Sequence, residues 1–333
     1  MFPDLVTEPA PKSQLAPLPE KVLSLGDIVS LTFRRFRLYY KLYFKALFWP
    51  AVFCSLASHL AYFCLRHWIS IASTSMLAMA PFVLHMALAL VSLIIWFFSA
   101  WELCLRSCAL VRTVLCLDAT YKDSLTLLKK RAGTVFFACN LALLPPALCL
   151  IFWSVVIVAA AASLNISLGG SERVAIGTLV FAFIGFALTV SVMISGLFGS
   201  LLLAVVTLEQ ISFVESFKRT WFFVSMRMMR GGSFTSLLAV AIALVCVVIE
   251  SPMIILQVIE QTSHATFKLS QTPYLVDILE TILEVPFNIF TFSISFTAYG
   301  LFYRDLRLRL EGADLLARLA RLAKSNETKA EEI

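Results

Sequence analysis

The chain has 333 residues, a formal net charge of +6, and a composition that is 60% hydrophobic and only 14% charged. Soluble domains average about 25% charged residues, so this composition excludes an ordinary soluble protein and indicates one that crosses a membrane several times. Each membrane-spanning helix uses about 20 residues, and the segments that remain are too fragmented to form a separate soluble catalytic domain.

Six long apolar stretches follow one another along the chain. Residues 1–20, before the first, are rich in proline and have no apolar core, so we expect a disordered tail and not a signal peptide. The membrane domain is expected over residues 21–324, and residues 325–333 are expected to form a second disordered tail. The expected spans are about 44–65, 77–104, 134–163, 174–207, 233–259 and 276–303. This pattern predicts an all-α polytopic membrane protein with six transmembrane helices.

Three segments, each before a pair of spans, begin with the same helix signal. A Ser or Thr precedes an Asp or Glu by three residues, which is a capping box that satisfies the first free backbone N–H groups of a helix. The pairs are Ser24 with Asp27, Thr120 with Asp123, and Ser212 with Glu215. A short amphipathic stretch with basic residues follows each pair. The near-equal spacing favours three repeated units of an interfacial amphipathic helix plus a transmembrane hairpin, and the alternative is a set of ordinary basic loops.

The positive charges lie almost entirely on one side of the predicted membrane. Of the 27 Lys and Arg residues, 24 fall in four segments that share one side, and the opposite side has Arg66, Arg173 and Lys268. Segments rich in Lys and Arg stay in the cytoplasm, so both termini are expected to be cytoplasmic.

The basic residues of the three repeated segments are candidates for binding anionic lipid headgroups. A basic amphipathic helix beside a span lies in the headgroup plane with its apolar side toward the acyl chains. Nucleic acid is not an expected partner, because these residues lie beside spans and no nucleic-acid motif is present. The candidate headgroup-binding residues are Arg34, Arg35, Arg37, Lys129, Lys130, Arg131, Lys218 and Arg219.

The last hairpin has acidic residues near its outer end. Glu250 and Glu284 each stand two residues before a proline and lie at a similar depth, counted at about 1.5 Å per helical residue. Ionisable groups within a bilayer are candidates for function. They predict either an outward-facing vestibule for a cation, a proton or a polar headgroup, or a solvated acidic helix end. The candidate vestibule residues are Glu250, Glu260, Asp277, Glu280 and Glu284.

Small residues recur every four positions on the fourth span, at Ala187, Ser191, Ser195 and Gly199. Such a stripe lets a neighbouring helix approach closely. We expect packing inside the bundle, and the alternative is an interface with a second copy or another protein.

The remaining polar residues give weaker signals. Glu102 and Arg106 are four residues apart and are expected to form an ion pair at a helix end. His59 has no carboxylate or cysteine partner evident in the sequence, so we expect a packed or interfacial side chain. No nucleophile, zinc, nucleotide or dinucleotide motif is present, and no catalytic residue, cofactor or metal is expected.

Three parts of the chain show a family resemblance. They are Leu25-Gly26-Asp27-Ile28 with Phe33–Arg37, the segment with Glu209, Ser212 and Glu215–Trp221, and Tyr303–Asp314. Together they resemble bacterial proteins related to the membrane domain of glycerophosphoryl diester phosphodiesterases. The resemblance implies an integral domain of about six helices in a bacterial inner membrane. The soluble phosphodiesterase barrel found in some relatives is not expected here, because the chain has no room for it.

Three classes of function stay open. The first is a non-catalytic membrane scaffold or accessory protein that interacts with lipids or partner proteins. The second is a transporter or lipid-translocating protein that uses the acidic vestibule. The third is an intramembrane enzyme that acts on lipid headgroups.

Overall fold

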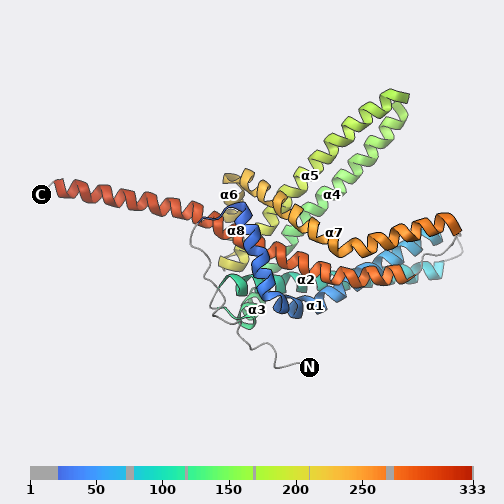
Figure 1. The fold of residues 1–333 in the computed structure, drawn as a ribbon, viewed down its shortest axis with the longest axis horizontal. Coiled ribbons are helices and arrows are strands. Elements are labelled where there is room, and N and C mark those ends of the chain that lie inside the picture. The colour runs from blue at the N-terminus through green and yellow to red at the C-terminus, as the bar shows by residue number, and fades with distance from the viewer. Residues whose placement is uncertain are drawn as a thin grey trace. The chain divides into compact units, whose positions relative to one another are not determined.

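The computed structural model describes residues 22–72, 79–116, 119–167, 170–209, 211–267 and 274–331; the tail predicted at 1–20 lies outside them. This part of the chain is all-α, without a strand (Figure 1). The helices are α1 (Leu25–Ala72), α2 (Met79–Leu115), α3 (Tyr121–Lys130), α4 (Ala132–Ser167), α5 (Gly170–Glu209), α6 (Phe213–Met226), α7 (Met228–Phe267) and α8 (Tyr274–Glu331).

Among the residues that the structure describes, five helices are long and apolar enough to cross a membrane, so the predicted all-α polytopic membrane fold is confirmed. The spanning stretches are Leu25–Cys64, Val83–Leu115, Val180–Glu209, Met228–Ile249 and Thr281–Leu310. The remaining predicted span, 134–163, falls within α4, where the apolar stretch among the described residues is the shorter Ala132–Ala142. The count of six spans and the threefold repeat stay predictions.

The three predicted capping boxes begin α1, α3 and α6. The backbone N–H groups of Asp27, Asp123 and Glu215 donate to the hydroxyl oxygens of Ser24, Thr120 and Ser212, over 3.1, 3.2 and 3.3 Å. Each helix begins at the residue after its cap. The three helix starts predicted from the sequence are therefore confirmed.

The helices that the caps begin differ in where they end. α3 ends at Lys130, and α6 ends before Arg227, whose φ of −137° and ψ of 35° are not helical. The predicted first interfacial helix is not a separate helix, because α1 continues from Leu25 through the first predicted span to Ala72, with Pro50 inside it. A capping box fixes a start, but neither Gly nor Pro stands between the first basic cluster and the first predicted span.

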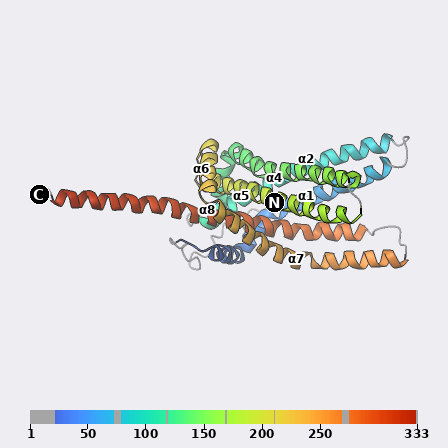
Figure 2. The ribbon, with the colours of Figure 1, turned by 90° about the horizontal axis from the view of Figure 1, so that it is seen from above.

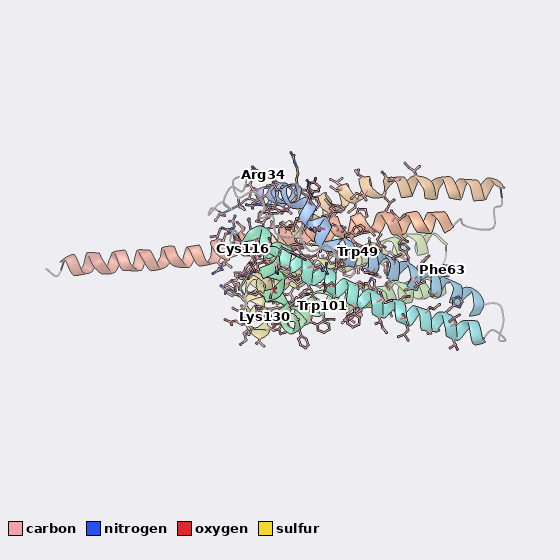
Figure 3. All side chains as sticks on the ribbon, turned by 90° about the horizontal axis from the view of Figure 1, so that it is seen from below. Arg34, Trp49, Phe63, Trp101, Cys116 and Lys130 are labelled. Atoms are coloured by element: carbon pink, nitrogen blue, oxygen red, sulfur yellow. The ribbon has the colours of Figure 1, made fainter. Side chains whose placement is uncertain are left out.

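The described part of one compact unit contains Phe33–Lys130 and Leu238–Phe296. Large side chains from α1, α2 and α3 are fully buried here, and Phe36 contacts both Tyr43 and Phe290, with ring centroids 5.5 and 5.3 Å apart. Figure 3 shows Arg34 and Lys130 toward one end of this unit and Phe63 toward the other. Arg34 and Lys130 thus lie toward the same end of this unit.

The described part of the second unit contains residues 22–32, Arg131–Leu237 and 297–331. α4 and α5 form an antiparallel hairpin, and α6 lies at the end where α4 begins and α5 ends (Figures 1 and 2). α7 and α8 are joined by aromatic packing, since the Phe234 ring stacks on Phe302 with centroids 4.2 Å apart and meets Tyr299 edge-on.

The C-terminal end differs from the sequence prediction. α8 is helical through to Glu331, whereas residues 325–333 were expected to be disordered. After Gly312 the sequence has neither Gly nor Pro and consists mainly of Ala, Leu, Arg, Lys and Glu. These residues favour helix, and nothing in the sequence stops the helix at Lys324.

Candidate functional site

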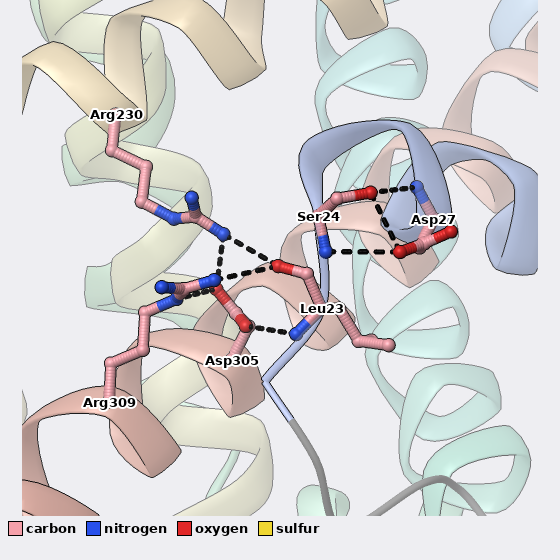
Figure 4. A network of polar contacts seen from close by, with 6 residues as sticks. All are labelled: Leu23, Ser24, Asp27, Arg230, Asp305 and Arg309. Carbon is pink, nitrogen blue, oxygen red and sulfur yellow. Dashed lines mark hydrogen bonds and ion pairs between the residues drawn. The ribbon is translucent and has the colours of Figure 1, made fainter.

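Asp305 lies at the centre of a buried polar network in the second unit (Figure 4). Its Oδ1 accepts the backbone N–H of Leu23 at 2.8 Å, and its Oδ2 accepts Arg230 Nη2 at 2.8 Å and Arg309 Nε at 2.9 Å. Both guanidinium groups also donate to the carbonyl oxygen of Leu23, at 2.9 and 2.8 Å. The network thus fixes the backbone of Leu23, next to the first capping box, against α7 and α8.

A second buried carboxylate, Glu209 at the end of α5, also has hydrogen-bond donors and arginine side chains around it. Its side chain is 5% exposed and accepts hydrogen bonds from Tyr303 Oη and from Arg219 Nη1, the latter at 2.5 Å. Arg307 Nη1 lies 3.6 Å from the same carboxylate. Glu209 therefore links the end of α5 to α6 and α8.

Both networks are suited to holding helix ends together. A buried carboxylate is stable only when charged partners and hydrogen bonds replace its lost water, and each of these has two arginines. In the sequence, Glu209 and the segment that contains Asp305 stood out only for the family resemblance, and no partner was predicted for either carboxylate. The available signal was the arginine-rich segment after the last span, but the partners of Asp305 and Glu209 are up to 282 residues away in the sequence.

The candidate headgroup-binding residues divide into two groups. Arg35 is buried, and its Nη1 lies 3.5 Å from the carbonyl oxygen of Val114. Arg131 donates hydrogen bonds to the carbonyl oxygens of Val206 and Ile211. Arg219 forms an ion pair with Glu209. These three arginines bind within the protein. The exposed residues are Arg34, Arg37, Lys129, Lys130 and Lys218.

α6 has an exposed aromatic edge beside Lys218. The helix buries Ser216, Thr220, Phe223 and Val224, whereas Trp221 is 62% exposed. The other exposed apolar side chains of this helix are Val214, Phe217, Phe222 and Met226. The ring of Phe198 on α5 contacts Phe217 and Trp221 at centroid distances of 5.2 and 6.3 Å. Exposed aromatic rings beside lysine are typical of a helix at the membrane interface.

Glu284 has a partner that the sequence analysis missed. His59 Nε2 lies 3.1 Å from Glu284 Oε2, and Ser58 Oγ lies 3.4 Å from the same oxygen. This carboxylate partner was not evident in the sequence, because His59 and Glu284 are adjacent only in the folded chain. The side chains of the other vestibule candidates, Glu250, Glu260, Asp277 and Glu280, lie outside the described residues.

The predicted Glu102–Arg106 pair is confirmed. Arg106 Nε donates to Glu102 Oε1 at 2.7 Å, and Nη1 donates to the carbonyl of Ala46 at 2.9 Å. Tyr121, the first residue of α3, lies close to this pair, and burial raises the pKa of Tyr121 to about 12. The pair therefore binds α1 to α2 near α3.

One member of the small-residue stripe packs within the α4–α5 hairpin. A Cβ added to Gly199 would lie 2.5 Å from Ala142 Cα, so the two backbones are in close contact. The hydroxyls of Ser191 and Ser195 donate to carbonyls of their own helix. Gly199 thus serves the packing of the hairpin, and an oligomer through the rest of the stripe stays a prediction.

No group of three metal-ligating side chains occurs among the described residues. No protein-family model, curated protein or solved structure matches this chain.

Proposed function

We propose that this integral membrane protein is a non-catalytic scaffold or accessory protein that binds anionic lipid headgroups on its basic side. The observation that carries the proposal is the exposed surface of α6, where Lys218 lies beside Trp221 and Phe217. An amphipathic helix with this surface gains from burying rings among the headgroups while its ammonium group meets lipid phosphate.

The exposed basic residues of the other unit support the same proposal. Lys129 and Lys130 end α3, and Arg34 and Arg37 lie on α1. A Lys or Arg near an anionic surface contributes about 1 kcal/mol to membrane attraction, so several together give a strong preference for acidic lipid. The proposal places this side in the cytoplasm of a bacterial cell. The relation to the membrane domain of glycerophosphoryl diester phosphodiesterases is part of the same proposal.

Native mass spectrometry of the protein in nanodiscs made from phosphatidylethanolamine and phosphatidylglycerol tests the lipid preference. The wild type should retain phosphatidylglycerol above its share in the disc, and Lys129→Gln with Lys130→Gln should reduce this enrichment. Thr126→Gln, an exposed change on the same helix, is the matched control. Equal enrichment in all three proteins would contradict headgroup binding.

The scaffold part of the proposal has its own measurement. Gentle extraction from the native membrane followed by native mass spectrometry should give a stable complex with another protein in fixed stoichiometry. Recovery of the chain without a protein partner, but with one specific small molecule bound, would contradict the scaffold and favour transport.

Transport is the second candidate, and the contact between Glu284 and His59 favours it. Polar and ionisable side chains facing each other within spanning helices are characteristic of substrate and ion pathways. If this candidate is correct, the thiol of Glu284→Cys should react with a membrane-impermeant thiol reagent added from the outer side. Protection from that reagent would count against a water-accessible pathway.

A further inference from the structure

A group of polar side chains joins α1 to α8 within their spanning stretches; we call it the outer polar cluster. It consists of Ser55, Ser58, His59, Glu284 and Asn288. Besides the two contacts to Glu284 Oε2, Asn288 Nδ2 donates to Ser55 Oγ at 3.4 Å. Ser55 and His59 are four residues apart, as are Glu284 and Asn288, so each helix brings its members to one face.

Glu284 differs from the other carboxylates that form ion pairs among the described residues. Glu102, Glu209 and Asp305 each pair with at least one arginine, whereas the ion-pair partner found for Glu284 among the described residues is His59. The imidazole and the Ser58 hydroxyl both approach Oε2. Oε1 has no hydrogen-bond partner among the described residues, and the side chain is 32% exposed. One carboxylate oxygen is thus available to a ligand.

The depth of the cluster suits a lipid headgroup. Glu284 is the fourth residue of the stretch Thr281–Leu310, and His59 lies five residues before the end of Leu25–Cys64. These are the ends of the two stretches away from the basic clusters. Three residues after His59, the Tyr62 side chain is 63% exposed, and exposed tyrosines are enriched at membrane interfaces.

The charge of the outer segments is complementary to a cation. From Glu250 to Glu284, with both included, the sequence contains five acidic residues and a single Lys or Arg, Lys268. A primary ammonium adds to this attraction three N–H donors that a carboxylate oxygen can accept.

We propose that the outer polar cluster binds the primary ammonium of a zwitterionic phospholipid headgroup in the outer leaflet. Glu284 Oε1 accepts an N–H of the ammonium, while His59 and Ser58 hold Oε2 and so fix the orientation of the carboxylate. The inference concerns binding at this cluster and holds whether or not the cytoplasmic side binds acidic lipid.

The experiment is a lipid competition in nanodiscs that contain equal parts of phosphatidylethanolamine and phosphatidylcholine, read by native mass spectrometry. The two lipids differ by three N-methyl groups, which remove every N–H donor. The wild type should retain phosphatidylethanolamine about tenfold over phosphatidylcholine, the ratio expected for a difference of about 1.4 kcal/mol. Glu284→Gln should bring this ratio close to one.

Glu215→Gln is the matched control. It makes the same chemical change at an exposed capping residue, where Gln also completes a capping box, so the lipid ratio should stay at the wild-type value. An unchanged ratio in Glu284→Gln would overturn the inference.

A measurement on the wild type covers the case in which Glu284→Gln does not fold. Retention of the N-methyl, N,N-dimethyl and N,N,N-trimethyl headgroups should fall stepwise as the donors are lost, and equal retention along the series would overturn the inference. Discs without phosphatidylethanolamine, with ethanolamine added in solution, separate lipid from a soluble ligand. Retention of free ethanolamine by the wild type, together with no preference among lipids, would overturn the assignment to lipid.

Discussion

Substitution of Asp305 by Asn tests whether the buried network at Leu23 stabilises the fold. The change keeps the size of the side chain but removes the charge that Arg230 and Arg309 share. Removing one partner of a buried ion pair costs about 3–5 kcal/mol, because the remaining charge is left without compensation. The two arginine side chains are 22% and 27% exposed and regain some water, so we expect a loss of about 2–4 kcal/mol.

The assay is reversible unfolding in mixed micelles, combined with hydrogen exchange of the backbone amides at the start of α1. The free energy of unfolding should fall, and the first turns of α1 should exchange faster because Asn has only one acceptor oxygen, which cannot serve both Leu23 and the two arginines as the carboxylate does. Asp123→Asn, the same change at an exposed capping residue, should cost no more than about 1 kcal/mol. Replacing Arg230 by Met in the Asp305→Asn protein should recover part of the loss, since it removes an uncompensated charge. A loss for Asp305→Asn no larger than for Asp123→Asn would refute the reasoning.

Three further predictions concern packing, ionisation and capping. Gly199→Ala should destabilise the protein by about 1–3 kcal/mol because the new methyl group meets Ala142. Gly196→Ala is the control, because its methyl group would meet open space and should not destabilise the protein. Thermal unfolding in detergent compares the stabilities of the two variants. The raised pKa of Tyr121 means that the folded protein keeps a proton that the unfolded chain releases from pH 10.0, so stability should fall between pH 10.0 and about 12. Tyr121→Phe should flatten that fall, as measured by chemical unfolding at pH 9 and 11. Ser212→Ala removes the hydroxyl acceptor that caps α6 and should cost about 1 kcal/mol in the same unfolding assay, with Ser212→Asp as the variant that retains an acceptor.

The sequence alone determined the features that depend on neighbouring residues. The low share of charged residues and the long apolar stretches predicted an all-α membrane protein, because a backbone in lipid must satisfy its own hydrogen bonds. The capping boxes at Ser24, Thr120 and Ser212 were found because their partners stand three residues away. The pair of Glu102 and Arg106 was found for the same reason, at a separation of four.

The tertiary structure decided which polar residues have internal partners. Arg34 and Arg35 are adjacent in the sequence and belong to the same predicted headgroup site, yet Arg34 is exposed and Arg35 is buried. Helical rotation of about 100° per residue sends neighbouring side chains to different faces, and only the packing shows which face is covered.

The contacts between distant residues were likewise beyond the sequence. Asp305 meets Leu23, and Glu284 meets His59, across more than 220 residues of chain. Charge and periodicity in a single sequence describe one helix at a time, and they do not state which helix becomes its neighbour. The choice of neighbour depends on the combined packing of apolar side chains across the bundle, which exists only in the folded chain.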